Sequence, residues 1–302
     1  MKYNDALVVP TLGNKKLLET LIDSINYQTE DSFDFILVVN QKTDKNELFS
    51  FISNISDKKI EIITQQGEGI IDAMNKALSL NYNNIILTDD DAMPNQDYIY
   101  NSLNALESNK GTGCVFGQVN GKFPDSRRNK ISRFVNSYCS TKSLLRGKAN
   151  RYFNLAGLPV GNILSSSPKK DVIDYLPIGV SMSWKQSNIK GLKIPIFSKR
   201  GIFFESYMSM AFYLKGLDTR FINNISVKHL DNNSLSRGPS SIDERIIDIY
   251  RFPFALYELG FDIKTEKLKK ILPLLDILSL NKRKLKKSIE ETISEIESRK
   301  RS

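Results

Sequence analysis

The sequence predicts an α/β protein in which a sheet is flanked by helices. In the first hundred residues, short apolar runs alternate with segments whose apolar residues recur at helical spacing. This alternation is typical of parallel βαβ units. Ligands of such sheets bind beyond the carboxyl ends of the strands. We therefore expect a functional site in the polar segments that follow the apolar runs, at residues 10–14, 40–44 and 88–91.

Four strands and three helices follow from this alternation. Strands are expected where the apolar runs lie, at Ala6–Val9, Phe35–Val39, Ile60–Thr64 and Asn84–Leu87. Helices are expected where the apolar spacing is three or four residues, at Lys16–Tyr27, Asp44–Ile55 and Gly69–Leu80.

The second part of the chain is less regular. Apolar runs predict strands at Val115–Val119, Ile178–Trp184 and Arg220–Val227. A helix is expected at Phe204–Leu214, because the apolar spacing stops shortly before Gly216. After Ser240 the pattern is helical, and from Lys264 onward the chain is rich in Lys and Leu, with Pro273 interrupting it.

Composition and charge narrow the class of protein. Of the 302 residues, 40% are apolar and 25% are charged, which excludes collagen-like and wholly disordered chains. The net charge of +9 favours an anionic partner. No run approaches the roughly 18–20 apolar residues that a membrane span requires, and Asn4 and Asp5 interrupt any signal peptide. Cys114 and Cys139 are expected to be free thiols, which suits a cytoplasmic location.

Three consecutive carboxylates follow the expected strand Asn84–Leu87, in the sequence TDDDAMP. Carboxylates at the end of a buried strand repel one another and are costly to desolvate, and a divalent cation relieves both effects. Alternation along an extended chain puts Asp89 and Asp91 on one side and Asp90 on the other. A solvated acidic turn is the alternative, but the position at the carboxyl end of a strand favours a cation site.

Four short motifs occur in order along the first hundred residues: ALVVPTLGN, FILVVNQKTD, GIIDAMNKAL and IILTDDDAMP. In this order and at these distances the chain resembles family 2 of the inverting glycosyltransferases, which have the GT-A fold. The resemblance covers residues 5–100 well and residues 175–232 more loosely. It implies a GT-A, Rossmann-like mixed sheet flanked by helices, to which the helical pattern after Ser240 adds a C-terminal helical extension.

The resemblance also implies residues that bind a nucleotide-diphosphate sugar. Pro10 and Thr11 would line the base and the ribose. Asn40 stands where the family usually has an acidic residue that reads the base, so an amide, which both donates and accepts, would face the base here. The full set implied is Pro10, Thr11, Asn40, Asp72, Asn75, Asp89, Asp90 and Gly179.

Three further residues receive catalytic or metal-binding roles from the resemblance. Aligning GIFFESYMSMAFYLKG on Gly216 puts Glu205 at the family's general base, although a shift of one residue would put Ser206 there. Glu205 could instead be a carboxylate that the dipole of its helix stabilises, and the two roles are compatible. Asp91 would bind the metal, and His229, the only histidine, would help to bind it or the diphosphate.

The expected function is that of a metal-dependent inverting glycosyltransferase of the hexosyltransferase type, acting with Mn²⁺ or Mg²⁺. It would move a sugar from a nucleotide-diphosphate sugar to a hydroxyl of a glycan or lipid-linked acceptor in surface polysaccharide or glycolipid synthesis. The alternatives are a non-enzymatic basic protein that binds nucleic acid or membrane, and a nucleotidyltransferase on a related fold. No nucleic-acid partner is expected, because no recognised nucleic-acid-binding motif appears in the sequence.

The expected domains are a catalytic domain at 1–235 and a basic helical extension at 236–302. Within the catalytic domain, residues 1–100 would bind the nucleotide sugar and residues 101–235 would face the acceptor. Eight basic residues and no acidic one lie between Ser126 and Arg151, and the tail from Lys264 to Arg301 is also basic. Such a tail could lie on the anionic inner face of the membrane, or form a packed helical hairpin with a solvated basic face.

Overall fold

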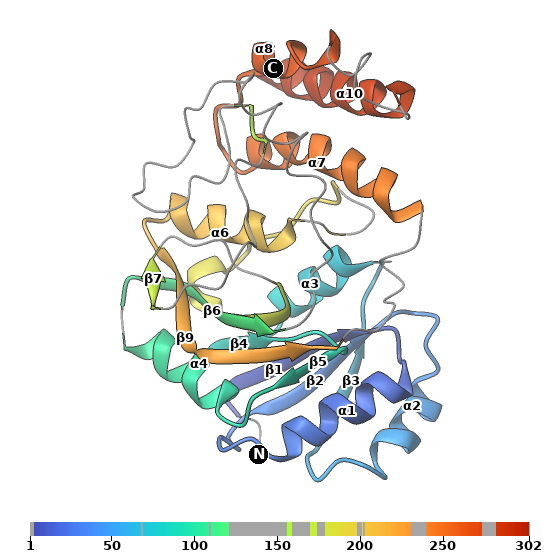
Figure 1. The fold of residues 1–302 in the computed structure, drawn as a ribbon, viewed down its shortest axis with the longest axis vertical. Helices are drawn as coiled ribbons and strands as arrows, with labels where there is room; N and C mark the ends of the chain where they lie inside the picture. Colours follow the sequence, from blue (N-terminus) through green and yellow to red (C-terminus); the bar gives the residue numbers. More distant parts are fainter. Residues whose placement is uncertain are drawn as a thin grey trace. The chain divides into compact units, whose positions relative to one another are not determined.

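The computed structural model describes residues 3–67, 69–108, 110–120, 156–158, 170–173, 179–197, 201, 203–230, 240–273 and 282–301 (Figure 1). These residues belong to two compact units. The sheet unit contains the described residues up to 120 together with 170–173, 179–194 and 204–230. The helical unit contains the other described residues, chiefly 240–273 and 282–301. The basic segment Arg127–Arg151 and Cys139 lie outside the described residues.

The described part of the sheet unit forms a nine-stranded mixed sheet. Its strands lie in the order β3-β2-β1-β4-β8-β6-β9-β5, and β7 pairs with β9. The strands are β1 (Asp5–Thr11), β2 (Asp34–Val39), β3 (Ile60–Thr64), β4 (Asn84–Leu87), β5 (Ala92–Pro94), β6 (Thr112–Asn120), β7 (Val172–Ile173), β8 (Met182–Lys185) and β9 (Asp218–His229).

The first four strands are parallel, as the alternation of apolar runs predicts. β1 pairs with β2 on one side and with β4 on the other, and β2 pairs with β3. Because both faces of these strands are covered, β1, β2 and β4 are apolar and buried along almost their whole length. Their carboxyl ends, at Thr11, Val39 and Leu87, therefore lie along one edge of the sheet.

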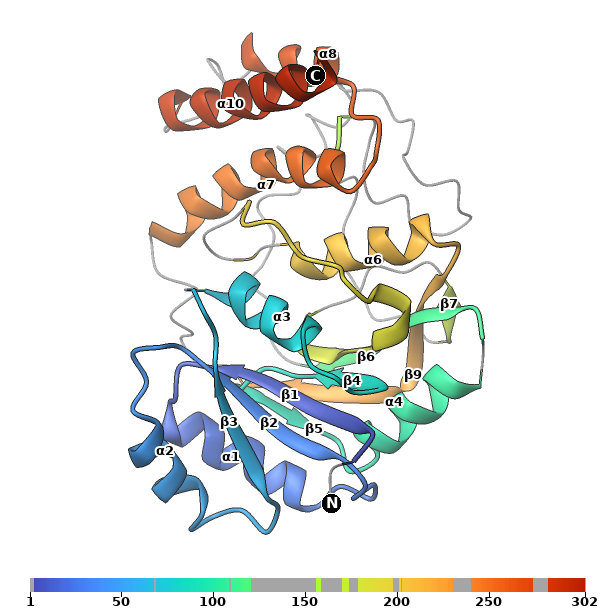
Figure 2. The same cartoon turned by 180° about the vertical axis from the view of Figure 1, so that it is seen from behind.

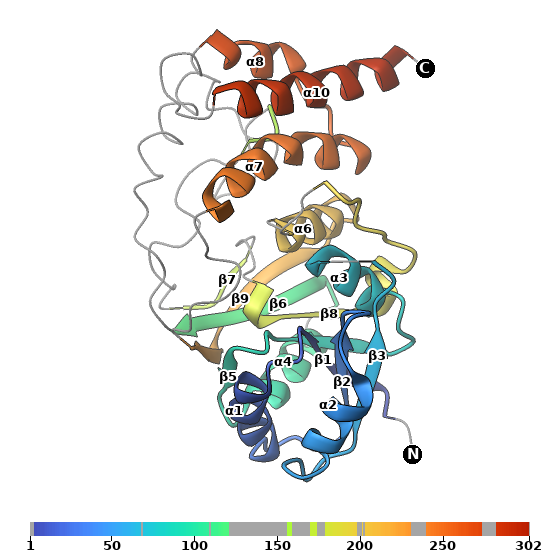
Figure 3. The same cartoon turned by 90° about the vertical axis from the view of Figure 1, so that its right-hand side faces the viewer.

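Helices cover both faces of this sheet. α1 (Lys15–Asn26), α2 (Lys45–Ile52) and α4 (Tyr98–Glu107) lie on one face, and α3 (Ile70–Leu78) and α6 (Phe204–Leu214) lie on the other (Figures 1 and 3). α1 buries Leu18, Leu21, Ile22 and Ile25, the apolar positions that predicted it. The core between the sheet and the helices α1, α2 and α4 also includes Phe35, Tyr98 and Val227.

Three features of the sheet differ from the predicted elements. The expected strand Ile178–Trp184 is a single 3₁₀ turn, η1 (Gly179–Ser181), followed by the strand β8, and residues 174–178 lie outside the described part. β8 runs antiparallel to both β4 and β6. Finally, β5 and α4 were not expected. β5 is only three residues long and is defined by its antiparallel pairing with β9.

The helical unit has an apolar core of its own. α10 (Lys282–Arg301) lies along α7 (Ser240–Glu258), next to the short α8 (Thr265–Lys269) (Figure 2). The buried residues of α10 are spaced by three or four positions and include Leu285, Ile289, Ile293 and Ile296. Hydrogen bonds from Thr292 to the Tyr250 carbonyl oxygen and from Arg251 to Glu295 connect the two long helices. Among the described residues, no helix combines the length and the apolar character that crossing a membrane requires.

Candidate active site

The acidic triplet lies in the short connection between β4 and β5, at the carboxyl edge of the parallel strands. Two buried hydrogen bonds fix the end of β4. The Tyr98 hydroxyl donates to the Leu87 carbonyl oxygen at 2.7 Å, and the Thr88 hydroxyl donates to the Val180 carbonyl oxygen at 3.0 Å. Both side chains are fully buried, so the position from which the triplet begins is set by the core.

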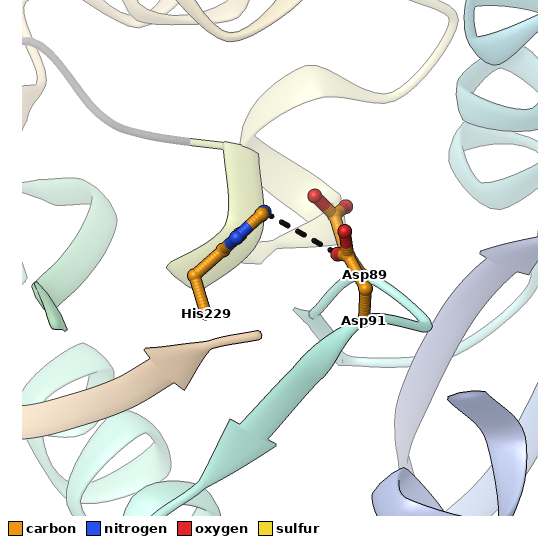
Figure 4. Close-up of side chains that lie close together, drawn as sticks. All are labelled: Asp89, Asp91 and His229. Atoms are coloured by element: carbon orange, nitrogen blue, oxygen red, sulfur yellow. Dashed lines mark ion pairs between the residues drawn. The ribbon is translucent and has the colours of Figure 1, made fainter. Parts of the chain in front are cut away.

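Asp89, Asp91 and His229 form a compact group at this edge (Figure 4). One ligand atom from each residue lies within 4.8 Å of the others, and His229 Nε2 is 3.3 Å from Asp91 Oδ1. His229 reaches this place because the end of β9 pairs with the start of β5, opposite Ala92. The Leu230 backbone N–H also donates to the Asp91 carbonyl oxygen at 2.8 Å. The antiparallel pairing of β5 with β9 thus brings the histidine to the carboxylates.

Asp90 points away from this group and toward β1, as alternation along the chain predicts. The Thr11 hydroxyl donates to Asp90 Oδ2 at 2.6 Å, and the backbone N–H of Leu12 also donates to the Asp90 carboxylate. The Thr11 oxygen in turn accepts from the Gly13 backbone N–H at 2.9 Å. Asp90 therefore ties the loop after β1 to the loop after β4.

The electrostatics of the triplet are unfavourable when no cation is bound. Burial chiefly, together with the neighbouring charges of Asp91, Asp90 and Glu205, raises the pKa of Asp89 to about 8. The pKa of Asp90 is also raised, chiefly by burial, although the hydrogen bonds from Thr11 and Leu12 oppose the shift. Several carboxylates thus share a site that disfavours their ionised forms.

The donor atoms of this group suit a hard divalent cation. Carboxylate oxygens are the ligands that Mg²⁺ and Mn²⁺ prefer, and an imidazole nitrogen is compatible with Mn²⁺. A bound cation would also oppose the repulsion that raises the pKa of Asp89. The ligand atoms and the negative charge of the group formed by Asp89, Asp91 and His229 therefore fit a divalent ion.

Glu205 stands in the first turn of α6, close enough to the acidic triplet for its charge to raise the pKa of Asp89. The preceding residue, Phe204, is buried, and its ring lies against Gly179. A Cβ atom at Gly179 would be 2.7 Å from Phe204 Cζ, so only glycine allows this approach. The contact of Phe204 with η1 therefore places the first turn of α6 beside the candidate site.

The family model described as "Glycosyl transferase family 2" matches residues 6–162 of this chain, which is more than half of it. The chain belongs to glycosyl transferase family 2. It is accordingly a glycosyltransferase, and this membership sets aside the non-enzymatic binder and the nucleotidyltransferase. Among curated proteins, no match was found.

Solved structures of glycosyltransferases share the fold at low sequence identity. A mannosyltransferase from Pyrobaculum calidifontis, in complex with GDP-Man and Mn²⁺, is 14% identical with a TM-score of 0.54, covering 99% of this chain and 76% of that one. Glucosyl-3-phosphoglycerate synthase from Mycobacterium tuberculosis, in complex with Mn²⁺, UDP-Glc and glycerol 3-phosphate, is 14% identical with a TM-score of 0.53, covering 85% and 80%. S. aureus TarS 1–349, in complex with UDP-GlcNAc, is 13% identical with a TM-score of 0.54, covering 99% and 82%. The fold is therefore GT-A, as predicted.

The remaining residues that the family resemblance singled out lie at the same edge or in the adjoining loops. Pro10 lies near the end of β1. Asn40 follows β2 directly, and its Oδ1 accepts from the Lys42 backbone N–H at 2.9 Å. The Asp72 carboxylate, in the first turn of α3, lies against the backbone of Gly67, where an added Cβ would be 2.3 Å from Asp72 Oδ2. Their roles toward a glycosyltransferase donor stay predictions.

Asn75 has two hydrogen bonds that the sequence did not reveal. Its Nδ2 donates to the Ile194 carbonyl oxygen at 2.9 Å, and its Oδ1 accepts from the Ile194 backbone N–H at 2.8 Å. The amide thus holds the segment near Ile194 against α3. Its predicted place near the nucleotide and the sugar is not tested by these bonds.

Two other features of the site add to the roles that the family resemblance implied. Asp89 was expected near the ribose or the donor sugar, and the structure groups it with the metal-ligand candidates Asp91 and His229. The bond from Thr11 to Asp90 joins residues 79 positions apart. The period-two alternation of the strand end already separated Asp90 from its neighbours and was the one available signal for both features.

Proposed function

We propose that this glycosyltransferase moves a hexosyl unit from a nucleotide-diphosphate sugar to an acceptor hydroxyl, with inversion at the anomeric carbon and with the help of Mn²⁺ or Mg²⁺. One observation carries the proposal. Two carboxylates and an imidazole converge at the carboxyl edge of the sheet, and a further carboxylate, Glu205 of α6, lies close enough for its charge to act on Asp89. Family membership and the fold support the same reaction class.

Asp91 and His229 would hold the cation, and the proximity of Asp89 to both supports its inclusion. When bound, the cation would neutralise the negative charge that develops on the leaving nucleotide diphosphate. The complexes of related folds with GDP-Man and Mn²⁺, and with UDP-Glc and Mn²⁺, support this donor class and this metal.

Glu205 would act as the general base. It would accept the proton of the acceptor hydroxyl while that oxygen attacks the anomeric carbon from the face opposite the leaving group. A single displacement of this kind inverts the anomeric configuration. The half-buried position of Glu205, and the effect of its charge on Asp89, support a place close to the reacting groups.

The donor nucleotide would lie over the loops after β1, β2 and β3. Pro10, Thr11 and Asn40 would line the base and the ribose, while Asp72, Asn75 and Asp90 would lie near the nucleotide and the sugar. Gly179 would lie beside the donor sugar. Because it has no side chain, it also leaves room for the Phe204 ring. The hydrogen bond between Thr11 and Asp90 supports a donor site whose edge is already formed before the donor binds.

The acceptor would be a glycan or a lipid-linked molecule of surface polysaccharide or glycolipid synthesis, reached from the cytoplasmic side of the membrane. The exposed side chains of Arg283, Lys284, Lys286 and Lys287 at the start of α10 support contact with an anionic leaflet. Each well-placed basic residue near such a surface contributes about 1 kcal/mol. Residues 1–235 would form the catalytic domain, with a donor half at 1–100 and an acceptor half at 101–235, and residues 236–302 would form the basic extension.

A thermal-shift panel tests the donor class. Among UDP-, GDP- and dTDP-sugars, the donor that the enzyme uses should raise the melting temperature only when Mn²⁺ or Mg²⁺ is present, because a ligand that binds only the folded state stabilises it. Glu205→Gln, with Glu19→Gln on α1 as the control, tests the base. Glu205→Gln should lower turnover of the donor found in the panel by about 10²–10⁴-fold, and full activity of this variant would remove Glu205 from that role.

A further inference from the structure

The strand β9 changes its outer neighbour along its length. Its first part pairs with β7 at residues 220–221, and its last part pairs with β5 at residues 227–229. On the other side, β9 pairs with β6 along both parts. The last residue of β9 is His229, so the pairing with β5 brings this candidate metal ligand to the acidic triplet.

The two parts of β9 are separated by a bulge. Phe116 of β6 pairs with Phe221. Two residues further along β6, Gln118 pairs with Ser226. Four residues of β9, 222–225, therefore stand opposite a single residue of β6, which is an excess of three. We call these four residues the β9 bulge. Bulges bend a strand, change the direction of side chains and are frequent next to active sites.

The β9 bulge reverses the face of the sheet on which the odd-numbered residues of the strand lie. Before the bulge, the Thr219 hydroxyl forms a 2.9 Å hydrogen bond with the Ser209 hydroxyl of α6. After the bulge, Val227 lies in the core with α1, α2 and α4, on the opposite face. Residues an even number of positions apart share a face in an unbroken strand, so this reversal follows from the odd excess. His229, two residues after Val227, owes its face to the bulge.

Contacts with β6 and α4 hold the β9 bulge. A Cβ atom at Gly117 would be 2.0 Å from the Ile225 carbonyl oxygen, so only glycine lets the bulge lie against β6. The Asn224 amide donates to Asn101 Oδ1 at 3.1 Å, and the Asn101 amide donates to the Asn224 carbonyl oxygen at 3.0 Å. These two hydrogen bonds attach the bulge to α4.

We propose that the β9 bulge, with Gly117 and Asn101 as positioning residues, sets the place of His229 and so the affinity of the site for the divalent cation. This inference rests on the proposed role of His229 as a metal ligand. Without an odd excess, His229 would be turned to the other face of the sheet, away from Asp89 and Asp91. Without glycine at 117, the bulge could not lie against β6, and the direction of the last part of β9 would change.

Two glycines of β6 provide a matched pair of variants. Gly117→Ala presses on the backbone of the bulge, whereas the Cβ of Gly113→Ala would be 2.7 Å from the Phe212 ring of α6. Both variants are overpacked and should melt at a lower temperature than the wild-type chain. Gly117→Ala should lower the affinity for Mn²⁺ by about 10–100-fold, the usual effect of losing a group that orients a metal ligand. Gly113→Ala should bind Mn²⁺ like the wild-type chain. Electron paramagnetic resonance of the free ion measures both affinities.

The same substitutions in a His229→Ala chain separate positioning from a general loss of structure. Gly117→Ala should cause no further loss of Mn²⁺ affinity there, because it acts through the imidazole. Asn101→Ala detaches the bulge from α4 and should lower Mn²⁺ affinity by about 2–10-fold, the range of a hydrogen bond of ordinary strength, again only when His229 is present. Asn104→Ala, at an exposed position of α4, is its control.

The imidazole also gives a readout that needs no metal. His229 is the only histidine of the chain, so in protein without a histidine tag one imidazole Cε1–H signal in proton–carbon NMR spectra reports on its surroundings. At fixed pH this signal should move in Gly117→Ala and Asn101→Ala, and should stay in place in Gly113→Ala and Asn104→Ala.

Wild-type Mn²⁺ affinity in folded Gly117→Ala would overturn the inference, and so would an equal loss in Gly113→Ala or a further loss in the His229→Ala chain. If Gly117→Ala does not fold, Asn101→Ala decides by the same criteria, with Asn104→Ala as its reference. If His229→Ala itself binds Mn²⁺ like the wild-type chain, the proposed metal role of the imidazole has failed. The NMR signal alone then decides whether the bulge sets the place of His229, and an unmoved signal would contradict it.

Discussion

His229 Nε2 lies 3.3 Å from Asp91 Oδ1, and this contact joins the end of the longest strand of the sheet to the acidic triplet. The contact depends on the register in which His229 stands opposite Ala92. With Asp89 in the same group, the side chains of two separate strand ends present two oxygens and one nitrogen to a common point.

Removing the imidazole should weaken binding of the cation. His229→Ala should lower the affinity for Mn²⁺ by more than about tenfold, because even groups that only orient metal ligands are worth about 10–100-fold. Titration of free Mn²⁺ by electron paramagnetic resonance measures this directly. Asp23→Asn, which neutralises an exposed carboxylate on α1, is the control for net charge and should bind like the wild-type chain.

The raised pKa of Asp89 predicts how stability depends on pH. The pKa is about 8 in the folded chain and 3.8 ordinarily, so the folded state holds a proton that the unfolded state releases between these values. Without metal, the melting temperature should therefore fall as the pH rises from 5 to 8.

Mn²⁺ should reduce this fall, because the cation binds the ionised carboxylate and releases the proton. Asp89→Asn should also reduce the fall, because an amide does not titrate. A metal-free melting temperature that stays flat over this range, or that changes equally in Asp89→Asn, would contradict the assignment.

Thr11 should stabilise the chain through Asp90. Thr11→Val keeps the shape of the side chain but removes the 2.6 Å hydrogen bond to the Asp90 carboxylate. The free energy of unfolding should fall by about 1.5–3 kcal/mol, the usual contribution of a hydrogen bond to a charged group. Chemical denaturation of Thr11→Val and Thr11→Ser measures it, and the serine variant should retain most of the stability. Equal losses in both variants would indicate packing rather than the hydrogen bond.

Gly179 should be intolerant of a side chain. The Cβ of Gly179→Ala would lie 2.7 Å from Phe204 Cζ, so the Phe204 ring must shift. Overpacking of this kind costs about 1–3 kcal/mol of stability, and turnover should fall as the start of α6 moves. Phe204→Leu in the same chain should relieve the clash and recover stability. If Gly179→Ala is as stable as the wild-type chain, the close approach of Phe204 is wrong.

The parallel half of the sheet could be predicted because its signals are local. β3 and β4 have the predicted bounds, and β1 and β2 differ by a few residues, since a strand covered on both faces reads as a short apolar run. β5 could not be predicted, because three residues become a strand only through pairing with β9. The start of α4 is rich in Tyr and Ile, which favour strands, and its packing against β6 and β9 decides for helix.

The site was predictable to a similar extent. The triplet and the opposite orientation of Asp90 follow from the sequence, because strand alternation is local. The grouping of His229 with Asp91 depends on a pairing between distant strands, and only the family resemblance indicated it.

The central claim is that the acidic group binds the cation that accompanies the donor nucleotide. Anomalous diffraction from crystals grown with Mn²⁺ and either UDP or GDP tests it most directly. We expect one peak within roughly 2.0–2.6 Å of a carboxylate oxygen of Asp91 and of His229 Nε2, the range of hard-cation bonds, next to the diphosphate. An ordered nucleotide with Mn²⁺ bound elsewhere, or with no ion beside Asp91, would contradict the account.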